Sequence, residues 1–598
     1  MQPTFCDVPL GKTRLLAVKT EERVQPSVFQ TRFALNRAYV LSLSNDNLLQ
    51  NYYQEAGLWA PREKPGAIHW GWETPTCQLR GHFLGHWLSA AARLYATTGD
   101  EVARAKANFV VAELGRCQAE RDGEWAGSIP PHYLDWIARG KRVWAPHYTL
   151  HKTLMGLIEM YTLGGNEQAL AILDNWARWF HRWTGQFSRS QLDDILDVET
   201  GGMLEAWADL YGITGKEEHL ELVHRYDRPR LFERLLAGED PLTNRHANTT
   251  IPEAHGAARA WEVTGERRWR DIAEAYWRCA VTDRGYYATG GQTCGEFWTP
   301  PYQLSARLGD KNQEFCTVYN MMRLAEYLYR WTGDIQYAEY WERNLYNGVL
   351  AQQHPVTGMI AYFLPFHAGA IKAWGTPTED FWCCHGTLVQ AHAMHGQHVY
   401  YTSESGLVVA QYVPTSLDWE WAGVRVRVEQ TFDPQLEQVH RPRSAAYELT
   451  IAAERPVDFA LTLRLPGWLS GQPTITVNGE RQETRGQPAS YHVIRRTWTQ
   501  DRVRVVFPKA LTTCALPDRP DTAAFLDGPV VLAGLVNEER RLRGDAARPE
   551  TMLVDDNERE WRSWEPGYRT IGQDRGFRLV PIYDVADERY TVYFPIEG

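Results

Sequence analysis

The chain has 598 residues, and its 63 basic and 74 acidic side chains give a net charge of −11 that is dispersed rather than gathered in runs. This balance argues against nucleic acid as a partner, because nucleic-acid-binding surfaces concentrate positive charge. The length requires several domains. The 25 Trp and 29 Tyr are a surplus that suits either a carbohydrate-handling surface or large cores.

Membrane and secretory signals are missing from the sequence pattern. No stretch of about 18 uninterrupted apolar residues occurs, and the first residues lack the apolar region of a signal peptide. The nine cysteines are an odd number spread over a long chain, which argues for reduced thiols rather than a disulfide framework. We therefore expect a soluble, cytoplasmic protein without a membrane partner.

A short element recurs in the first two thirds of the chain, where an apolar–aromatic pair is soon followed by glycine. The copies end at Gly99, Gly165, Gly215, Gly265 and Gly333, which lie 66, 50, 50 and 68 residues apart. Each glycine separates two amphipathic runs, as expected for the left-handed residue that ends a helix. The repeat predicts helical hairpins.

Five such hairpins and a helical segment around residues 37–53 make about six. Six hairpins that close on themselves form an (α/α)6 barrel, which we expect over residues 1–395. An open stack of hairpins is the alternative. The long loops between the repeats favour the closed barrel.

Short runs of alternating polarity, rich in β-branched residues, replace the helical pattern after about residue 395. Asn478-Gly479 is a strong signal for a tight hairpin turn. We expect a β-sandwich over residues 396–511 and a smaller C-terminal β domain over residues 512–598. The predicted fold class is multidomain, α then β, with an (α/α)6 barrel catalytic domain followed by β-sandwich modules.

Chemistry is concentrated in a few loop segments. The adjacent cysteines Cys383 and Cys384 are followed by His385, and upstream Glu314 and Cys316 stand two residues apart. That spacing turns two side chains to one side of an extended segment. Thiolates with one carboxylate are a donor set that Zn²⁺ accepts, but free cysteines are also among the most buried residues, so the spacing alone leaves both interpretations open.

Glu296 is a candidate general acid. A carboxyl group between Gly295 and Phe297 can be held in a partly apolar setting that raises its pKa. A solvated loop glutamate is the alternative.

Histidines occur in pairs four residues apart in the helical half, with a further one near residue 250. They are His82, His86, His147, His151 and His246. The pairs lack the glutamate of an HExxH zinc site, so we interpret these residues as hydrogen-bonding groups for a polyhydroxylated ligand. Histidines satisfied within the core are the alternative.

Seven motifs in a fixed order resemble glycoside hydrolase family 127, the β-L-arabinofuranosidases that were long a domain of unknown function. The motifs are GHFLGH (81–86), the segment 144–152, GGM (201–203), HANT (246–249), GE (295–296), EFC (314–316) and WCCHG (382–386). The resemblance extends from about residue 30 to the end of the chain. Seven ordered motifs are far more specific than any single one.

The resemblance implies an exo-acting retaining glycoside hydrolase with an (α/α)6 barrel and β-sandwich modules, which removes terminal β-L-arabinofuranosyl residues. In the family pattern Cys383 is the nucleophile and Glu296 is the acid/base. A zinc ion, Zn²⁺, is held by Glu314, Cys316, Cys383 and Cys384. The implied partner is an L-arabinofuranose-containing glycan or oligosaccharide, and whether the chain forms a homodimer stays open.

The resemblance extends to substrate contacts as well. His151 and His246 match motifs whose histidines touch the bound sugar, and His82 is a third candidate for substrate binding. The chain departs from the family pattern at Leu204, Cys294 and Phe315. These differences concern how the substrate is recognised, and they leave the predicted zinc ligands and nucleophile unchanged.

Two other functional classes stay open from the sequence. A zinc-dependent thiol-activating enzyme on a helical toroid, resembling the lanthionine cyclases, would use His385 as a ligand. A non-catalytic carbohydrate-binding protein would have cysteines that are merely buried.

Overall fold

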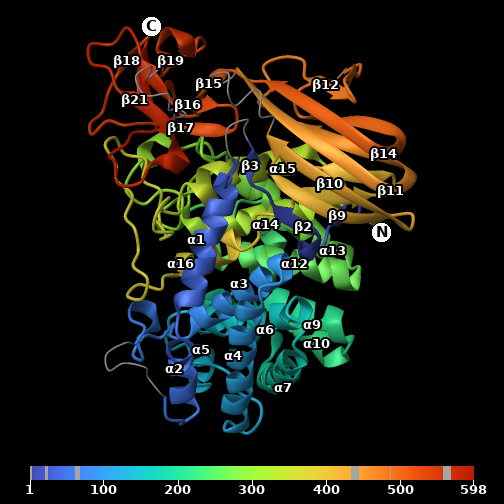
Figure 1. Ribbon diagram of the computed structural model, residues 1–598. Helices are drawn as coiled ribbons and strands as arrows, with labels where there is room; N and C mark the ends of the chain where they lie inside the picture. Colours follow the sequence, from blue (N-terminus) through green and yellow to red (C-terminus); the bar gives the residue numbers. More distant parts are fainter. Residues whose placement is uncertain (1–2, 20–23, 61–67, 433–442, 485, 557–566) are drawn as a thin grey trace.

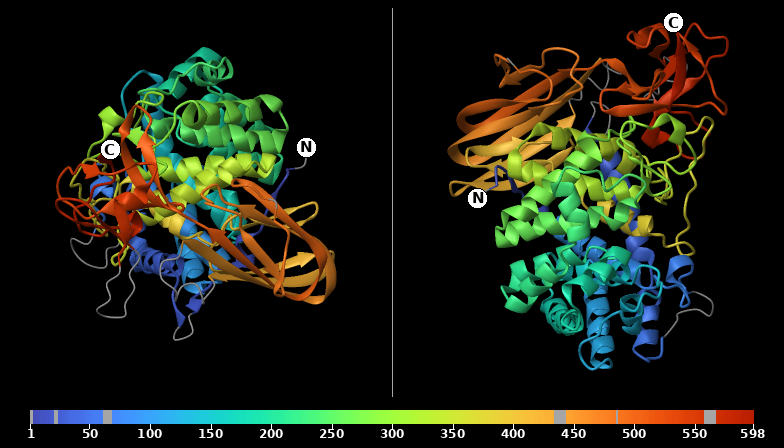
Figure 2. Two further views of the ribbon diagram at one scale, coloured as in Figure 1. Left: turned by 90° about the horizontal axis from the view of Figure 1, so that it is seen from above. Right: turned by 180° about the vertical axis from the view of Figure 1, so that it is seen from behind.

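The computed structural model describes residues 3–19, 24–60, 68–432, 443–484, 486–556 and 567–598. A helical part is followed by two β-rich parts, which both lie on the same end of the helical part (Figure 1, Figure 2). The change from helix to strand falls near residue 395, where the sequence pattern predicted it. Among the described residues, no helix has the length and apolar character needed to cross a membrane.

Sixteen α-helices occur within the described residues. They are α1 (Val28–Ser42), α2 (Asn45–Glu55), α3 (His82–Thr98), α4 (Glu101–Ala119), α5 (His132–Ala138), α6 (Pro146–Thr162), α7 (Glu167–Thr184), α8 (Arg189–Val198), α9 (Met203–Thr214), α10 (Glu217–Arg225), α11 (Pro229–Leu236), α12 (Ile251–Thr264), α13 (Arg267–Trp277), α14 (Phe315–Thr332), α15 (Ile335–Asn344) and α16 (Cys383–His392).

The five predicted hairpins are confirmed as the contacting pairs α3–α4, α6–α7, α9–α10, α12–α13 and α14–α15. The five repeat glycines have φ between 65° and 73°, a region that a side chain makes costly. At the end of α3, the Gly99 N–H donates to the Tyr95 carbonyl at 2.7 Å. In four hairpins the recurring glycine is the C-cap residue of the first helix, whereas α6 is capped by Leu163 and Gly165 lies two residues further on.

Six helices within the described residues contact one another in a closed ring, in the order α3, α6, α9, α12, α14, α16 and back to α3. Glycines let these helices approach closely. A Cβ on Gly85 of α3 would lie 2.0 Å from the Lys152 carbonyl of α6, and a Cβ on Gly386 of α16 would lie 2.1 Å from the His86 ring of α3. Larger residues at either position would force the ring apart.

The sixth ring helix is not the one that the sequence pattern suggested. Residues 37–53 fall in α1 and α2, and α1 contacts both α16 and α3, whereas α16 itself completes the ring. All residues of α16 from Cys384 to His392 are buried. A short helix that is buried all round has no polar face, so it leaves no amphipathic period in the sequence.

The first β-rich part is a ten-stranded sheet in the order β1-β7-β8-β11-β10-β9-β2, with β14 beside β11 and β12 joined to β13 and β14. Its strands are β1 (Cys6–Asp7), β2 (Thr13–Leu15), β7 (Tyr400–Ser403), β8 (Gly406–Val409), β9 (Thr415–Trp421), β10 (Val424–Phe432), β11 (Ser444–Leu465), β12 (Thr474–Val477), β13 (Glu480–Arg481) and β14 (Ser490–Pro508).

Three features of this sheet can be compared with the predicted strands, turn and domain boundary. The runs 447–452 and 458–465 form one strand, β11, with an irregularity between Ala452 and Val457 in its pairing with β14. Asn478 and Gly479 have φ of 53° and 87° and join β12 to β13, which confirms the predicted hairpin turn. Residues 6–15, expected in the helical domain, instead contribute β1 and β2, which pair with β7 and β9.

The second β-rich part is an eight-stranded sheet in the order β18-β22-β16-β17-β21-β20-β19, with β15 beside β16. Its strands are β15 (Leu511–Leu516), β16 (Arg519–Asp527), β17 (Val530–Gly534), β18 (Leu542–Arg543), β19 (Leu553–Asp555), β20 (Tyr568–Thr570), β21 (Arg578–Pro581) and β22 (Phe594–Glu597). Elsewhere among the described residues, β3 (Val18–Lys19) pairs with β4 (Val24–Gln25), and β5 (Thr293–Cys294) pairs with β6 (Phe297–Trp298).

A buried charged cluster joins the first sheet to the helical part. Arg464 of β11 is fully buried and donates to Glu339 at 2.5 Å and to Glu342 at 2.6 Å, both on α15. The Trp468 indole also donates to Glu342, at 2.9 Å. Because a buried charge must be paired, this contact fixes the sheet on α15.

Replacing Arg464 with Met is expected to lower the thermal unfolding midpoint by several degrees, since Glu342 would stay buried without its cation. Breaking a buried pair in this way costs about 3–5 kcal/mol. The control is Arg427→Met, because Arg427 is exposed and its pairs with Asp418 and Glu429 are each worth about 0–1 kcal/mol. Scanning calorimetry of both variants measures the midpoints. Equal midpoints would contradict the role given to Arg464.

Candidate active site

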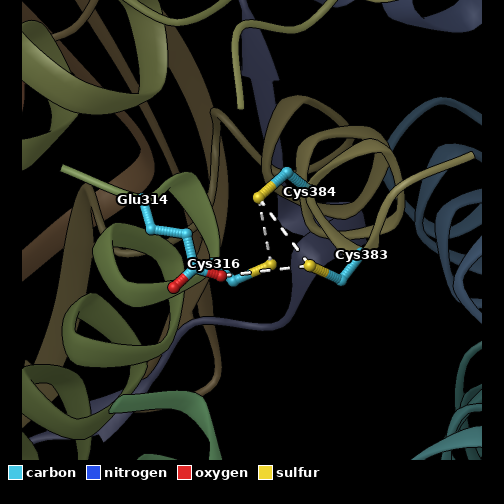
Figure 3. Close-up of side chains that lie close together, drawn as sticks. All are labelled: Glu314, Cys316, Cys383 and Cys384. Atoms are coloured by element: carbon cyan, nitrogen blue, oxygen red, sulfur yellow. Dashed lines mark hydrogen bonds between the residues drawn. The ribbon is translucent and has the colours of Figure 1, made fainter. Parts of the chain in front are cut away.

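The N-termini of two ring helices meet at the centre of the site. Glu314 is the N-cap residue of α14 and Cys316 is the second residue of that helix, while Cys383 and Cys384 are the first two residues of α16. The side chains from the two helices point toward one another (Figure 3). A helix N-terminus carries partial positive charge, so both helices favour negative groups at this point.

The four side chains form a compact donor cluster. One ligand atom from each of them lies within 4.8 Å of all the others. The Sγ atoms of Cys316 and Cys384 are 3.4 Å apart, and Cys383 Sγ lies 4.0 Å from Cys384 Sγ and 3.9 Å from Glu314 Oε1. Zinc–sulfur bonds of about 2.3 Å in a tetrahedron separate the sulfurs by roughly 3.8 Å. The cluster therefore fits a small tetrahedral cation.

Glu314 is held by side-chain amides and hydroxyls. Asn248 donates to Glu314 Oε1 at 2.6 Å and Thr317 donates to Oε2 at 3.2 Å, while Asn320 donates to the side-chain oxygen Oδ1 of Asn248 at 3.1 Å. Burial, and then the neighbouring charge of Cys383, raises the pKa of Glu314 well above its usual range. A bound cation would reverse that effect by favouring the carboxylate.

Cys383 is distinct from the two thiols beside it. Hydrogen bonds from the Cys316 and Cys384 thiols lower the pKa of Cys383 well below its ordinary value. Burial raises the pKa of Cys316 and of Cys384. Cys383 is also only partly buried, whereas Cys384 is fully enclosed. Of the three thiols in the cluster, Cys383 is therefore the most easily deprotonated and the most accessible.

A cavity of about 410 Å³ opens beside this thiol. Cys383, Glu296, Glu314, His246 and Tyr362 all contribute to its wall. The volume falls within the range of small-molecule sites. The cavity thus brings the candidate nucleophile and the candidate acid into one space.

Glu296 sits in a strained turn. It follows Gly295 in the two-residue loop that joins β5 to β6, and the two residues have φ of 59° for Gly295 and 72° for Glu296. Positive φ at both central residues marks a type I′ turn, whose second position favours glycine. A glutamate retained there at a cost in strain is typical of a functional residue.

The surroundings of Glu296 are more polar than the sequence suggested. The Tyr362 hydroxyl donates to the Glu296 carboxylate and lies 3.4 Å from Cys383 Sγ. His246 Nε2 lies 3.4 Å from Glu296 Oε2. The Glu296 side chain is 30% exposed, and its neighbour Phe297 is 43% exposed, so the carboxyl group is only partly enclosed. Tyr362 carried no signal in the sequence, because it lies in an irregular segment far from both partners.

Only some of the histidines predicted to bind substrate lie at the cavity. His246 lines the cavity, whereas His82 and His151 are buried and do not appear in its wall. His82 donates from Nε2 to the Phe381 carbonyl at 2.8 Å, just before the helix that carries the thiols. His86, four residues from His82, does line the cavity.

The remaining site predictions concern His385 and the three positions at which the chain differs from the family pattern. His385 does not belong to the donor cluster, and its Nε2 lies 3.2 Å from the Thr376 carbonyl. Leu204 and Phe315 are buried in the core, and none of Leu204, Phe315 and Cys294 lines the cavity.

Comparisons with known families cover most of the chain. The family described as "Beta-L-arabinofuranosidase, GH127 catalytic domain" matches residues 22–397, and "Beta-L-arabinofuranosidase, GH127 middle domain" matches residues 406–509. A non-reducing end beta-L-arabinofuranosidase of Bifidobacterium longum subsp. longum is 23% identical over 456 residues, which cover 73% of this chain and 60% of that protein. The match therefore spans less than two thirds of the relative's length.

Solved structures of the same fold extend over nearly the whole chain. A GH127 beta-L-arabinofuranosidase from Geobacillus stearothermophilus T6 has a TM-score of 0.71 at 19% identity, with 97% of this chain and 99% of that one covered. A second GH127 beta-arabinofuranosidase has a TM-score of 0.73 at 17% identity, with 100% and 98% covered. These similarities establish the shared fold.

In protein freed of metal by a chelator, iodoacetamide at pH 7 is expected to modify Cys383 before Cys384 and Cys316, because its lowered pKa gives more thiolate and it is partly exposed. Cys77 and Cys514 serve as controls, since they are also partly buried but burial raises the pKa of each. Peptide mapping by mass spectrometry over time measures the order. Earlier modification of Cys384 or of either control would contradict the assignment.

Proposed function

The chain belongs to glycoside hydrolase family 127, and we propose that it is an exo-acting retaining glycosidase that removes terminal β-L-arabinofuranosyl residues from a glycan or oligosaccharide. The proposal rests chiefly on one arrangement: a thiol of lowered pKa, Cys383, and a carboxyl group, Glu296, face one cavity and are bridged by the Tyr362 hydroxyl. A nucleophile and a proton donor within reach of one substrate are what retaining glycosidases require.

The reaction takes two steps on these side chains. Cys383 Sγ attacks the anomeric carbon while Glu296 donates its proton to the departing glycosidic oxygen, so a carbon–sulfur bond forms as the carbon–oxygen bond breaks. Glu296, now a carboxylate, takes a proton from water, and the water oxygen attacks the same carbon and releases Cys383 as thiolate. Tyr362 holds the Glu296 carboxyl group in place through both steps.

We propose that the donor cluster holds Zn²⁺ through Glu314, Cys316, Cys383 and Cys384. Three sulfur atoms with one carboxylate suit zinc, whereas magnesium and calcium prefer oxygen ligands. When bound, zinc keeps coordinating thiols deprotonated near neutral pH. Cys383 then needs no separate base.

The finer architecture follows the same family assignment. We propose that the closed ring of α3, α6, α9, α12, α14 and α16 is the inner wall of an (α/α)6 barrel. The second helices of the hairpins support this, because α4 contacts α7 and α7 contacts α10. We also propose that the ten-stranded sheet forms a β-sandwich in which the two halves of β11 serve different layers. Val428 of β10 pairs with Ile451 before the irregularity, and Gly406 of β8 pairs with Ala460 after it.

Neither alternative class is favoured by an observation at the site. A cyclase-like zinc centre would use His385, which does not belong to the cluster of Glu314, Cys316, Cys383 and Cys384. A purely sugar-binding protein has no use for a strained Glu296 linked through Tyr362 to a thiol.

Wild-type protein is expected to release nitrophenol from p-nitrophenyl β-L-arabinofuranoside, and Cys383→Ala is expected to abolish the release. Glu296→Gln should lower kcat by about 10²–10⁴-fold on an alkyl arabinofuranoside, whose leaving group needs a proton, and by less on the nitrophenyl glycoside. Cys294→Ser is the matched control, because Cys294 shares the hairpin with Glu296 but does not line the cavity. Steady-state kinetics gives these values. No release at any pH from about 4 to 8 would overturn the proposed activity.

Purified protein is expected to contain about one zinc ion per chain, and Cys384→Ser and Glu314→Gln should each lower that content sharply, because each removes one of four ligands. Cys117→Ser is the control, since Cys117 is a buried cysteine on α4 outside the cluster. Elemental mass spectrometry measures the metal, and circular dichroism checks the fold. A zinc content that Cys384→Ser leaves unchanged would contradict the proposal that this cluster binds the ion.

A further inference from the structure

His86 contributes its side chain to the cavity wall and has one ring nitrogen, Nε2, that is buried without a hydrogen-bond partner among the described residues. The side chain is fully buried and belongs to the wall of the cavity that holds Cys383. Its Nδ1 lies 2.7 Å from Gln390 Oε1, whereas its Nε2 has no hydrogen-bond partner among the described residues. A buried polar atom left without a partner costs free energy, so such an atom beside a cavity calls for a ligand group.

A chain of hydrogen bonds fixes the state of this imidazole. Gln390 Nε2 donates to Ser89 Oγ at 2.7 Å, so the amide oxygen is the atom turned to His86. The Ser89 hydroxyl donates to Glu159 at 2.7 Å, and Arg93 holds that carboxylate through contacts of 2.7 and 2.6 Å. Because Gln390 Oε1 can only accept, His86 Nδ1 carries the proton, and Nε2 carries a lone pair.

The imidazole lies close to the nucleophile helix. A Cβ on Gly386, one turn after Cys383, would lie 2.1 Å from the His86 ring, so the ring packs directly on the first turn of α16. Burial, and then the positive charge of Lys152, lowers the pKa of His86 well below its ordinary value. The ring therefore stays neutral and able to accept.

The neighbouring His82 shows the contrast. Its Nε2 donates to the Phe381 carbonyl at 2.8 Å, and its Nδ1 accepts from the Tyr148 hydroxyl at 3.0 Å. Both ring nitrogens are thus used within the protein. Of these two histidines on one helix face, only His86 has hydrogen-bonding capacity left for a ligand.

We propose that His86 Nε2 accepts a hydrogen bond from one hydroxyl group of the sugar ring bound beside Cys383, and that Gln390 is the positioning residue that fixes its tautomer. This inference rests on the proposed glycosidase function and adds a determinant of sugar specificity to it. A site built to accept from a hydroxyl rejects a ligand that lacks it, because the acceptor is then left unpaired.

The test compares p-nitrophenyl β-L-arabinofuranoside with its 2-, 3- and 5-deoxy analogues. In the wild type, one analogue is expected to have kcat/KM about 10–100-fold below the parent. In His86→Leu, kcat/KM for the parent glycoside should fall to the value for that analogue. The parent-to-analogue ratio of kcat/KM then approaches one, while the ratios for the other two analogues stay unchanged. His86→Gln, which keeps an acceptor near the Nε2 position, should restore part of the ratio. Gln390→Leu should reduce the same ratio, because the proton of His86 is then no longer fixed on Nδ1.

The outcomes separate this inference from the proposed function. A wild type that hydrolyses the parent but discriminates against none of the analogues overturns the role of His86 alone. A ratio that survives unchanged in Gln390→Leu, and in His86→Leu where that variant folds, overturns it as well, since a purely structural histidine would slow all four substrates equally. A wild type that hydrolyses none of them overturns the glycosidase assignment and this inference with it.

Discussion

The meeting of two helix N-termini is the constraint on which the site depends. α14 and α16 each begin at the same point, and their first residues place a carboxyl group and three thiols within 4.8 Å of one another. Three of these four side chains are buried, and among the described residues no lysine or arginine forms an ion pair with Glu314. The partial positive charge at the two helix N-termini favours the anionic forms of these groups, and hydrogen bonds from Asn248 and Thr317 to Glu314 act in the same direction. At the same point the neighbouring thiols lower the pKa of Cys383.

Strained backbone delivers the functional residues to this point. Residues with positive φ precede or carry each functional segment: Gln313 before Glu314, Phe381 two residues before Cys383, and Glu296 itself. Ala145, with φ of 45°, is the N-cap residue of α6, whose Tyr148 lines the cavity. Such conformations cost about 1–3 kcal/mol each and persist only where the surrounding packing enforces them. The close glycine contacts of the ring supply that packing.

The ring also separates structural from ligand-directed polar groups. Histidines, glutamates and arginines are buried between the inner helices, but most of them satisfy one another, as Arg93 does with Glu159 and Arg323 with Glu205. These networks fix helix rotation, and helix rotation decides which side chain reaches the cavity. His86 is directed there, while His82, on the same face of α3, is used to hold the segment that leads into α16.

The sequence by itself determined the features that depend on a few neighbouring residues. The glycines that end the helices, the Asn478-Gly479 turn and the change to strands near residue 395 are set by local backbone preference, and the ordered motifs identified the family with its thiols and carboxylates. Tertiary structure alone decided that α16 closes the ring, that residues 6–15 join a sheet formed by residues 400–508, and that Tyr362 bridges Glu296 and Cys383. Those contacts join residues far apart in the chain, so packing selects them and no local pattern records them. Tertiary structure also decided that His86 rather than His82 lines the cavity. Both lie on one face of α3, and only the rotation of α3 within the ring distinguishes them.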